Sequence, residues 1–297
     1  MNLNKEEGIR SSIFDYLQLT KPKIIPLLLL VAVASAFIAK KSIPSLYTLA
    51  ALVIAGTLVS AGSLALNSYL EMDIDAKMRR TRRRPLPSKR IVPPGKALIF
   101  ALSLLSLGVI ISYHTLNVIS ATFIALGAVI YVPVYTMYLK PRTVWNIVLG
   151  GFAGSCASLA GWYAVPNNDW IVGWALAALV FIWTPSHFWS LAVITEEDYS
   201  SVSIPMLPSV VGPAKAARAI VANTLILIPV SLIIYPYMTG IGAFLYLAGS
   251  SLFNFLLLVT NIKLLASPTK DNAWFAFKFS SPYLAVIFVL SVVGALL

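Results

Sequence analysis

The chain has 297 residues, of which 59% are hydrophobic and only 11% are charged. A water-soluble domain of this length cannot bury so much apolar surface, so the composition excludes an ordinary soluble enzyme and indicates a protein embedded in the lipid bilayer. The formal net charge is +11, and the single cysteine, Cys156, excludes an internal disulfide and a thiolate metal cluster.

The chain begins with a polar segment, residues 1–22, which we expect to form a cytoplasmic arm rather than a cleavable signal. Nine apolar runs follow, each near the ~20 residues that cross the hydrocarbon layer. They cover residues 24–40, 45–70, 95–113, 117–138, 144–164, 170–195, 216–237, 239–262 and 277–297. Because the connections are short, we predict an all-α, polytopic membrane protein with nine transmembrane helices in a single domain, 1–297.

The basic residues predict how these helices are oriented. If the N-terminus is cytoplasmic, all 22 lysines and arginines except Lys40 and Lys41 fall on the cytoplasmic side. Cytoplasmic loops carry such an excess. We therefore expect a multi-pass protein of the cell membrane with its N-terminus in the cytoplasm and its C-terminus outside. Since this asymmetry accounts for most of the net charge, the charge does not indicate nucleic-acid binding.

An amide and three carboxylates lie at the end of the second predicted helix. Asn67, Glu71 and Asp75 are spaced by four residues and share one helix face, whereas Asp73 points roughly the other way. Mg²⁺ takes oxygen ligands and is typically bound by one or two carboxylates together with phosphate oxygens. We interpret the three residues of this ladder as Mg²⁺ ligands. The alternative is that the acids merely end a helix in the headgroup region.

Basic residues follow the ladder directly and occupy six of the eight positions from 77 to 84. We expect one or two of Lys77, Arg80 and Arg84 to contact an anionic ligand such as diphosphate, while topology and lipid headgroups account for the others. Lys140 and Arg142 follow the fourth predicted helix on the same side. They either complete an anion pocket or serve only as topology signals.

A second acidic group, Glu196, Glu197 and Asp198, follows the sixth predicted helix on the same side. Two carboxylate groups can hold two Mg²⁺ ions against a diphosphate from opposite sides. Metal ions placed in this way stabilise the charge that develops on the leaving group when an allylic diphosphate ionises. The alternative is an ordinary acidic loop.

A histidine, His187, lies inside the sixth predicted helix, two residues after Pro185. Ionisable groups within membrane helices are candidates for acid–base chemistry or ligand binding, and the proline is expected to kink the helix. The alternative is a histidine hydrogen-bonded between helices. Eleven residues of helix place His187 about 16 Å from Asp198, so it would serve the acceptor rather than the diphosphate.

At these residues the sequence resembles the intramembrane prenyltransferases of the UbiA type, and within them the protoheme IX farnesyltransferase (haem O synthase) family. The resemblance runs from Leu19 to about Gly212. It includes the segments 67–78, 135–136, 139–140, 142–143 and 146–148. It also includes four short motifs, which are Leu-Thr-Lys-Pro at 19–22, His-Phe-Trp at 187–189, Asp-Tyr at 198–199 and Pro-Met-Leu-Pro at 205–208. The ladder identifies the wider superfamily, whereas the last three motifs point to the haem branch. Glu71 departs from the pattern, since the family usually has aspartate there.

The resemblance implies nine helices around a central cavity open to the cytoplasmic side. It implies Mg²⁺-dependent transfer of a farnesyl group from farnesyl diphosphate to a vinyl group of haem B, with release of diphosphate. The resemblance assigns metal and diphosphate binding to Asn67, Glu71, Asp75, Glu197 and Asp198. It assigns contacts with the diphosphate to Lys77, Arg80, Arg84, Lys140 and Arg142, and contact with the haem to His187. Asp73 and Asn146 are further candidate site residues. Membrane lipid and a downstream haem-modifying or oxidase-assembly protein are further expected partners.

Two other functions compete with this interpretation. A sister prenyltransferase acting on an aromatic, quinone-precursor or lipid acceptor would share the acidic groups without needing the segment around His187. A transporter would use intramembrane histidine and acids as an ion pathway. Against the transporter, the two acidic groups lie at helix ends on one side, and the interiors of the predicted helices contain no acids.

Overall fold

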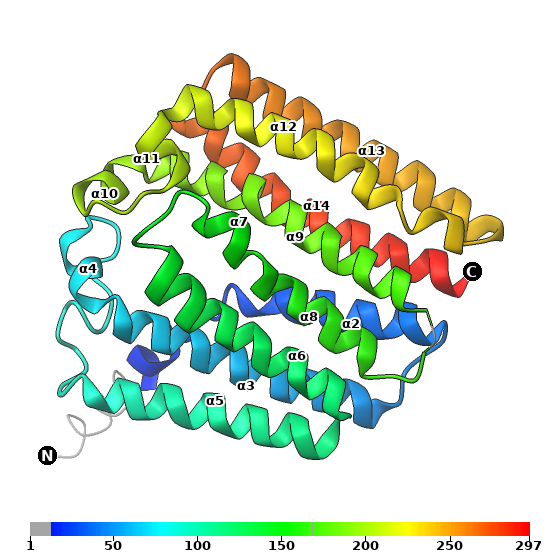
Figure 1. The fold of residues 1–297 in the computed structure, drawn as a ribbon, viewed down its shortest axis with the longest axis horizontal. Helices are drawn as coiled ribbons and strands as arrows, with labels where there is room; N and C mark the ends of the chain where they lie inside the picture. Colours follow the sequence, from blue (N-terminus) through cyan, green and yellow to red (C-terminus); the bar gives the residue numbers. More distant parts are fainter. Residues whose placement is uncertain (1–12, 168) are drawn as a thin grey trace, which may run out of the picture.

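The computed structural model describes residues 13–167 and 169–297, and over these residues the regular structure is helical (Figure 1). Residues 13–19 form a short helical turn before the first long helix. The elements that follow are α2 (Ile25–Lys40), α3 (Leu46–Leu70), α4 (Met72–Lys77), α5 (Gly95–Thr115), α6 (Val118–Val129), the π-helical η1 (Ile130–Leu139), α7 (Asn146–Gly150), α8 (Phe152–Tyr163), α9 (Trp170–Ile194), α10 (Glu196–Ser201), α11 (Leu207–Val211), α12 (Pro213–Leu232), the 3₁₀ turn η2 (Tyr235–Tyr237), α13 (Gly240–Ala266) and α14 (Lys270–Leu296).

The all-α, polytopic prediction is confirmed. In the described part of the chain, 7 helical segments are long and apolar enough to cross a membrane. The other two predicted spans fall on α2, which has 16 residues, and on the pair α7 and α8. The number of nine crossings, and their arrangement around a central cavity, therefore stay predictions.

The fifth predicted span is divided where the chain passes close to α9. A Cβ atom on Gly151 would lie 3.1 Å from the side chain of Thr184 of α9. A second close approach joins α8 to α2, because a Cβ atom on Gly161 would lie 1.8 Å from the carbonyl oxygen of Ala32. Small residues at such positions let membrane helices pack backbone against backbone.

Several helices begin at residues that cap them. Ser45 Oγ accepts a hydrogen bond from the Thr48 amide at 3.1 Å at the start of α3, and Asn117 Oδ1 accepts one from Ser120 at 2.9 Å at the start of α6. Asp169 does the same for α9. Each cap satisfies an amide that would otherwise lack a partner in the first helical turn.

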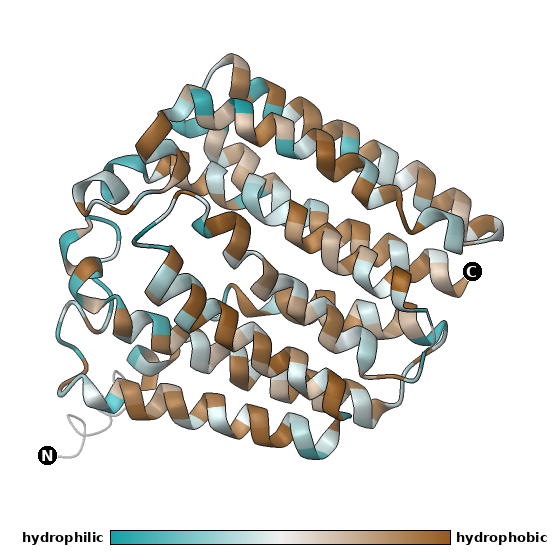
Figure 2. Cartoon of the chain, viewed as in Figure 1, coloured by the Kyte–Doolittle hydropathy of each residue, from teal (hydrophilic) through white to brown (hydrophobic). Residues whose placement is uncertain are grey.

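The two ends of the bundle differ in composition. The short helices α4, α10 and α11 gather at one end, on the left of Figure 1, whereas the C-terminus and the connection between α8 and α9 lie at the other. In Figure 2, teal, hydrophilic residues are frequent in the connections, and brown, hydrophobic residues predominate along the long helices. The 25 residues of α9 make it about 37 Å long, which is enough to join the two ends.

Candidate active site

The Asn67–Glu71–Asp75 ladder lies at the end of the bundle that carries α4. Although α3 ends at Leu70 and α4 begins at Met72, the hydrogen bonds Glu71 N–H to Asn67 O (3.0 Å) and Asp75 N–H to Glu71 O (2.8 Å) continue the helical register across the junction. The three residues are 3%, 7% and 3% exposed, whereas Asp73 is exposed to solvent. The predicted shared face is confirmed, and so is the different direction of Asp73.

Each member of the ladder contacts a different cation. Arg84 Nη1 lies 2.7 Å from Asp75 Oδ2, and Lys140 Nζ lies 2.5 Å from Glu71 Oε1. The third cation, Lys21, donates to Asn67 Oδ1 at 2.6 Å. Because isolated buried carboxylates are costly, these cations make the burial of the acids possible.

Lys21 is a member of the site that the sequence did not assign, although its segment at 19–22 belongs to the resemblance. It lies just before α2 and contacts Asn67, which is 46 positions later in the chain. Burial lowers the pKa of Lys21 from 10.5 to about 7, and the positive charge of Arg84 acts in the same direction. The side chain of Lys21 therefore changes between its charged and neutral forms near neutral pH.

Thr136 is the second group that the sequence did not assign. Its hydroxyl accepts a hydrogen bond from Asn67 Nδ2 at 3.1 Å and donates to the Tyr131 carbonyl oxygen at 2.8 Å, five residues earlier. That spacing fits the π-helical geometry of η1, in which Pro133 also lies. The oxygen of the Asn67 amide thus accepts from Lys21 and its nitrogen donates to Thr136, so the orientation of the amide is fixed in the absence of a ligand.

The second acidic group lies in a different environment. Asp198 accepts hydrogen bonds from the backbone amides of Arg79 (3.1 Å) and Arg80 (3.4 Å), which join α10 to the loop after α4. Glu197 is paired with Lys270 at 2.6 Å, and both are largely exposed. The hydrogen bond from Lys270 lowers the pKa of the Glu197 carboxyl.

The two acidic groups do not form one metal cluster. Within residues 13–167 and 169–297, no three acidic, histidine or cysteine side chains lie close enough together to hold a metal ion. A cavity of about 600 Å³ lies beside the second acidic group and is lined in part by Arg79, Arg80, Glu197 and Asp198, whereas no residue of the ladder lines it. The chemistry of the ladder, which is one amide and two carboxylates, nevertheless fits the oxygen ligands that Mg²⁺ prefers.

The five predicted diphosphate cations lie in three different environments. Lys140 and Arg84 contact the ladder, whereas Lys77 and Arg80 have exposed side chains. Arg142 donates to the carbonyl oxygens of Met137 (2.8 Å) and Tyr138 (3.0 Å) and thereby caps the end of η1, away from the ladder.

His187 is buried within α9, which continues without interruption across Pro185. Its ring stacks on Trp183 at a centroid distance of 4.4 Å and on Phe277 of α14 at 4.6 Å. Its Nδ1 is hydrogen-bonded to Ser280 Oγ at 2.5 Å, while Nε2 makes no hydrogen bond to the described residues. The interhelical bond agrees with the alternative considered for this histidine, and it also fixes the ring with one nitrogen available.

Asn146 is fully buried at the start of α7. Its Nδ2 donates to the carbonyl oxygens of Thr143 (2.6 Å) and Pro205 (3.2 Å), so it joins the connection after η1 to the segment before α11. Its Oδ1 has no partner among the described residues. Asn146 therefore supports the loops around the site and does not contact the ladder's cations.

The fold and this site together define a class, namely polytopic membrane enzymes with a polar, cation-ringed carboxylate site at one end of a helical bundle. Comparison with known proteins identifies the family. Residues 27–290 match the model of the UbiA prenyltransferase family, and the chain belongs to that family.

Individual relatives agree with this assignment. The chain is 45% identical to protoheme IX farnesyltransferase 1 of Cenarchaeum symbiosum over 279 residues, which cover 92% of this chain and 93% of the relative. Its fold is similar to that of a solved digeranylgeranylglyceryl phosphate synthase, with a TM-score of 0.77, 18% identity, and coverage of 98% and 99% of the two chains. It is also similar to a UbiA homologue from Archaeoglobus fulgidus bound to DMAPP and Mg²⁺, with a TM-score of 0.68, 15% identity, and coverage of 93% and 98%.

Proposed function

We propose that this protein transfers the farnesyl group of farnesyl diphosphate to a vinyl group of haem B, giving haem O and free diphosphate. The observation that carries the proposal is the buried Asn67–Glu71–Asp75 ladder with a separate cation on each member. Such a site offers oxygen ligands to a metal and positive charge to a diphosphate in the same place. The acceptor is inferred from the relative named protoheme IX farnesyltransferase 1.

The cations of the ladder would change partners when the substrate binds. Lys21, Arg84 and Lys140 would turn from the ladder to the diphosphate oxygens, and this would free the oxygens of Asn67, Glu71 and Asp75 for Mg²⁺. When bound, Mg²⁺ supplies positive charge that stabilises the departing diphosphate. Asp198 would supply a further carboxylate from α10, next to the loop after α4, from whose backbone amides it accepts hydrogen bonds.

The remaining steps follow from the chemistry of the substrates. The bond between the farnesyl carbon and the diphosphate oxygen breaks, and its electrons leave with the diphosphate. The vinyl group of the haem then donates its electron pair to the allylic cation. The new carbocation next to the porphyrin ring is captured by water, which loses a proton and leaves a hydroxyl group. The apolar interior of the bundle protects the allylic cation from bulk water.

His187 would contact the haem acceptor. Its ring is held by Trp183, Phe277 and Ser280, so Nε2 has a fixed direction. Flat aromatic surfaces beside a fixed nitrogen suit a planar macrocycle. The N-terminus and the ladder would face the cytoplasm of the cell membrane, as the basic loops indicate.

The proposal is tested by mass spectrometry of haem extracted after membranes containing the protein are incubated with haem B, farnesyl diphosphate and Mg²⁺. We expect a species heavier by one farnesyl group and one hydroxyl group, absent without Mg²⁺ and with Asp75→Ala. Unchanged haem, together with diphosphate release when an aromatic or glycerol lipid acceptor is supplied, would instead identify a sister prenyltransferase. No diphosphate release with any acceptor would contradict prenyl transfer altogether.

A further inference from the structure

The end of the bundle opposite the ladder carries few charges, and two of them line one cavity. Lys40 and Lys41 lie at the end of α2, and Asp169 precedes α9. Lys41 and Asp169 line a cavity of about 410 Å³, whereas Lys40 does not. This volume lies within the range of small-molecule sites.

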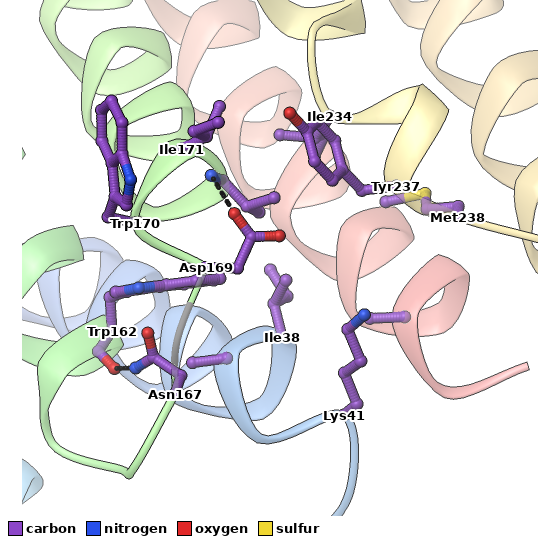
Figure 3. Close-up of a pocket in the computed structure, with 13 residues that line it drawn as sticks. Ile38, Lys41, Trp162, Asn167, Asp169, Trp170, Ile171, Ile234, Tyr237 and Met238 are labelled. Atoms are coloured by element: carbon purple, nitrogen blue, oxygen red, sulfur yellow. Dashed lines mark hydrogen bonds between the residues drawn. The ribbon is translucent and has the colours of Figure 1, made fainter.

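The walls of this cavity come from helices that are distant in the sequence. Figure 3 shows Asp169 and Lys41 extending toward the cavity from separate elements, with apolar and aromatic side chains around them. Those side chains are Ile38 of α2, Trp162 of α8, Trp170, Ile171 and Val172 of α9, and Ile234, Tyr237 and Met238 around η2. The cavity is therefore apolar over most of its wall and charged at two points.

Three polar groups that line the cavity, one each on Lys41, Asp169 and Trp162, have no partner among the described residues. The ammonium of Lys41 makes no hydrogen bond or ion pair to the described residues, in contrast to that of Lys40, which donates to the Ile43 carbonyl oxygen at 3.1 Å. Asp169 uses Oδ1 to cap α9 at the Val172 amide (3.4 Å), and Oδ2 has no described partner. Trp162 is 2% exposed, and its indole N–H has no acceptor. Buried donors of this kind are uncommon without a partner.

We propose that this cavity binds the head group of a zwitterionic phospholipid from the adjacent leaflet. The phosphate would lie on Lys41 and the amine on Asp169, since the two side chains carry opposite charges and are not paired with each other. The acyl chains would follow the apolar wall. Trp170 and Tyr237 have the amphipathic rings found at the membrane–water boundary, and their faces can also attract the amine.

The position of the cavity agrees with this occupant. It lies at the start of α9, about 37 Å along that helix from the end near the ladder, so a membrane that contains the helix has its opposite boundary here. Lysines on this side depart from the usual distribution of basic residues. A lipid phosphate gives Lys41 the partner that the described chain does not provide.

The test is native mass spectrometry of the purified full-length protein in detergent, titrated with a diacyl phosphatidylethanolamine. We expect Lys41→Gln and Asp169→Asn each to weaken binding about tenfold, because each removes a charged hydrogen-bonding partner. Asparagine still caps a helix, so Asp169→Asn should leave α9 intact. Lys40→Gln is the matched control, since it removes the same charge one residue away and should change the affinity less than about twofold.

A second variant tests the cavity itself. Ala295 lines it from α14, so Ala295→Trp should fill the space and abolish tight binding without altering either charge. Equal losses for Lys40→Gln and Lys41→Gln would overturn the proposal, because they would indicate general attraction to the surface. Binding of phosphatidylglycerol as tight as that of phosphatidylethanolamine, with no effect of Asp169→Asn, would also overturn it, since the amine would then have no role.

Discussion

The two acidic groups of this protein look alike in the sequence but lie in opposite environments. In the ladder, Glu71 and Asp75 are buried, and each contacts a cation from another part of the chain. In the second group, Glu197 is exposed and paired with an exposed lysine, and Asp198 is held by two backbone amides. Burial of a carboxylate costs desolvation free energy, which makes Glu71 and Asp75 candidates for a chemical role. An exposed ion pair, in contrast, contributes little to stability.

The comparison suggests different roles for the ladder and for Asp198. The ladder is a buried group of oxygens, and under the proposed function its cations would turn to the bound diphosphate. Asp198 instead joins α10 to the loop after α4, because it accepts hydrogen bonds from the backbone amides of Arg79 and Arg80 and makes no bond to the ladder. The following predictions test this difference, beginning with the largest expected effect.

Asp75→Asn should lower kcat/KM for farnesyl transfer by about 10³-fold, the upper range for loss of one group that stabilises charge in the transition state. The substitution keeps the shape of the side chain but removes its charge, and it leaves Arg84 without an anionic partner. Steady-state kinetics with haem B and farnesyl diphosphate give the measurement. Asp73→Asn is the matched control, two residues away and exposed, and similar losses in both variants would refute a special role for the ladder.

Asp198→Asn should lower kcat/KM by a smaller factor, about 10–100-fold, as expected for a group that orients others. An asparagine oxygen can still accept one of the two backbone amides, so the loop should stay in place while the charge is lost. The same assay applies, together with the melting temperature, which we expect to be unchanged. A loss of kcat/KM as large as that of Asp75→Asn would mean that Asp198 and Asp75 contribute equally to catalysis, which would contradict the proposed difference between the two acidic groups.

Lys21 should make the binding of prenyl diphosphate depend on pH. Its pKa of about 7 will rise when an anion binds, because the bound anion favours the charged ammonium. Affinity should therefore be highest below pH 7 and fall by up to about tenfold per pH unit as the pH rises above 7, until the pKa of the complex is reached. Lys21→Arg, which stays protonated, should lose this component of the pH profile. A profile unchanged by Lys21→Arg would exclude Lys21 as its source.

Glu197→Gln should have the smallest effect, less than about twofold on kcat/KM, because exposed ion pairs contribute little. Its carboxyl is already satisfied by Lys270 at the surface. Loss of Mg²⁺-dependent turnover in this variant, with a normal response in Lys270→Met, would show that Glu197 is a metal ligand after all, as the sequence suggested.

The sequence predicted those features that depend on local spacing. The long apolar runs predicted the helices, and the four-residue spacing predicted the shared face of Asn67, Glu71 and Asp75. That face survives even though α3 ends within the ladder, because the backbone bonds at Glu71 and Asp75 keep the register.

Features that depend on tertiary packing were not accessible in this way. Lys21 and Thr136 reach Asn67 across 46 and 69 positions, and no local pattern specifies such contacts. For the same reason, the sequence did not reveal that Ser280, 93 positions later, holds His187. The contact of Arg142 with η1 is local, but the sequence does not distinguish it from contact with a ligand. A basic residue near a helix end looks the same whether it faces a ligand, a carbonyl oxygen or water.

The pairing of Glu71 with Lys140 also has a consequence for how the protein is made. Lys140 lies 69 residues after Glu71, beyond α5, α6 and η1. On a ribosome, Glu71 therefore emerges well before its cation and must remain in water or in the translocation machinery until η1 has been synthesised. This part of the site therefore closes only after Lys140 has been synthesised, and a nascent chain interrupted before Lys140 carries Glu71 at the end of α3 without its cation.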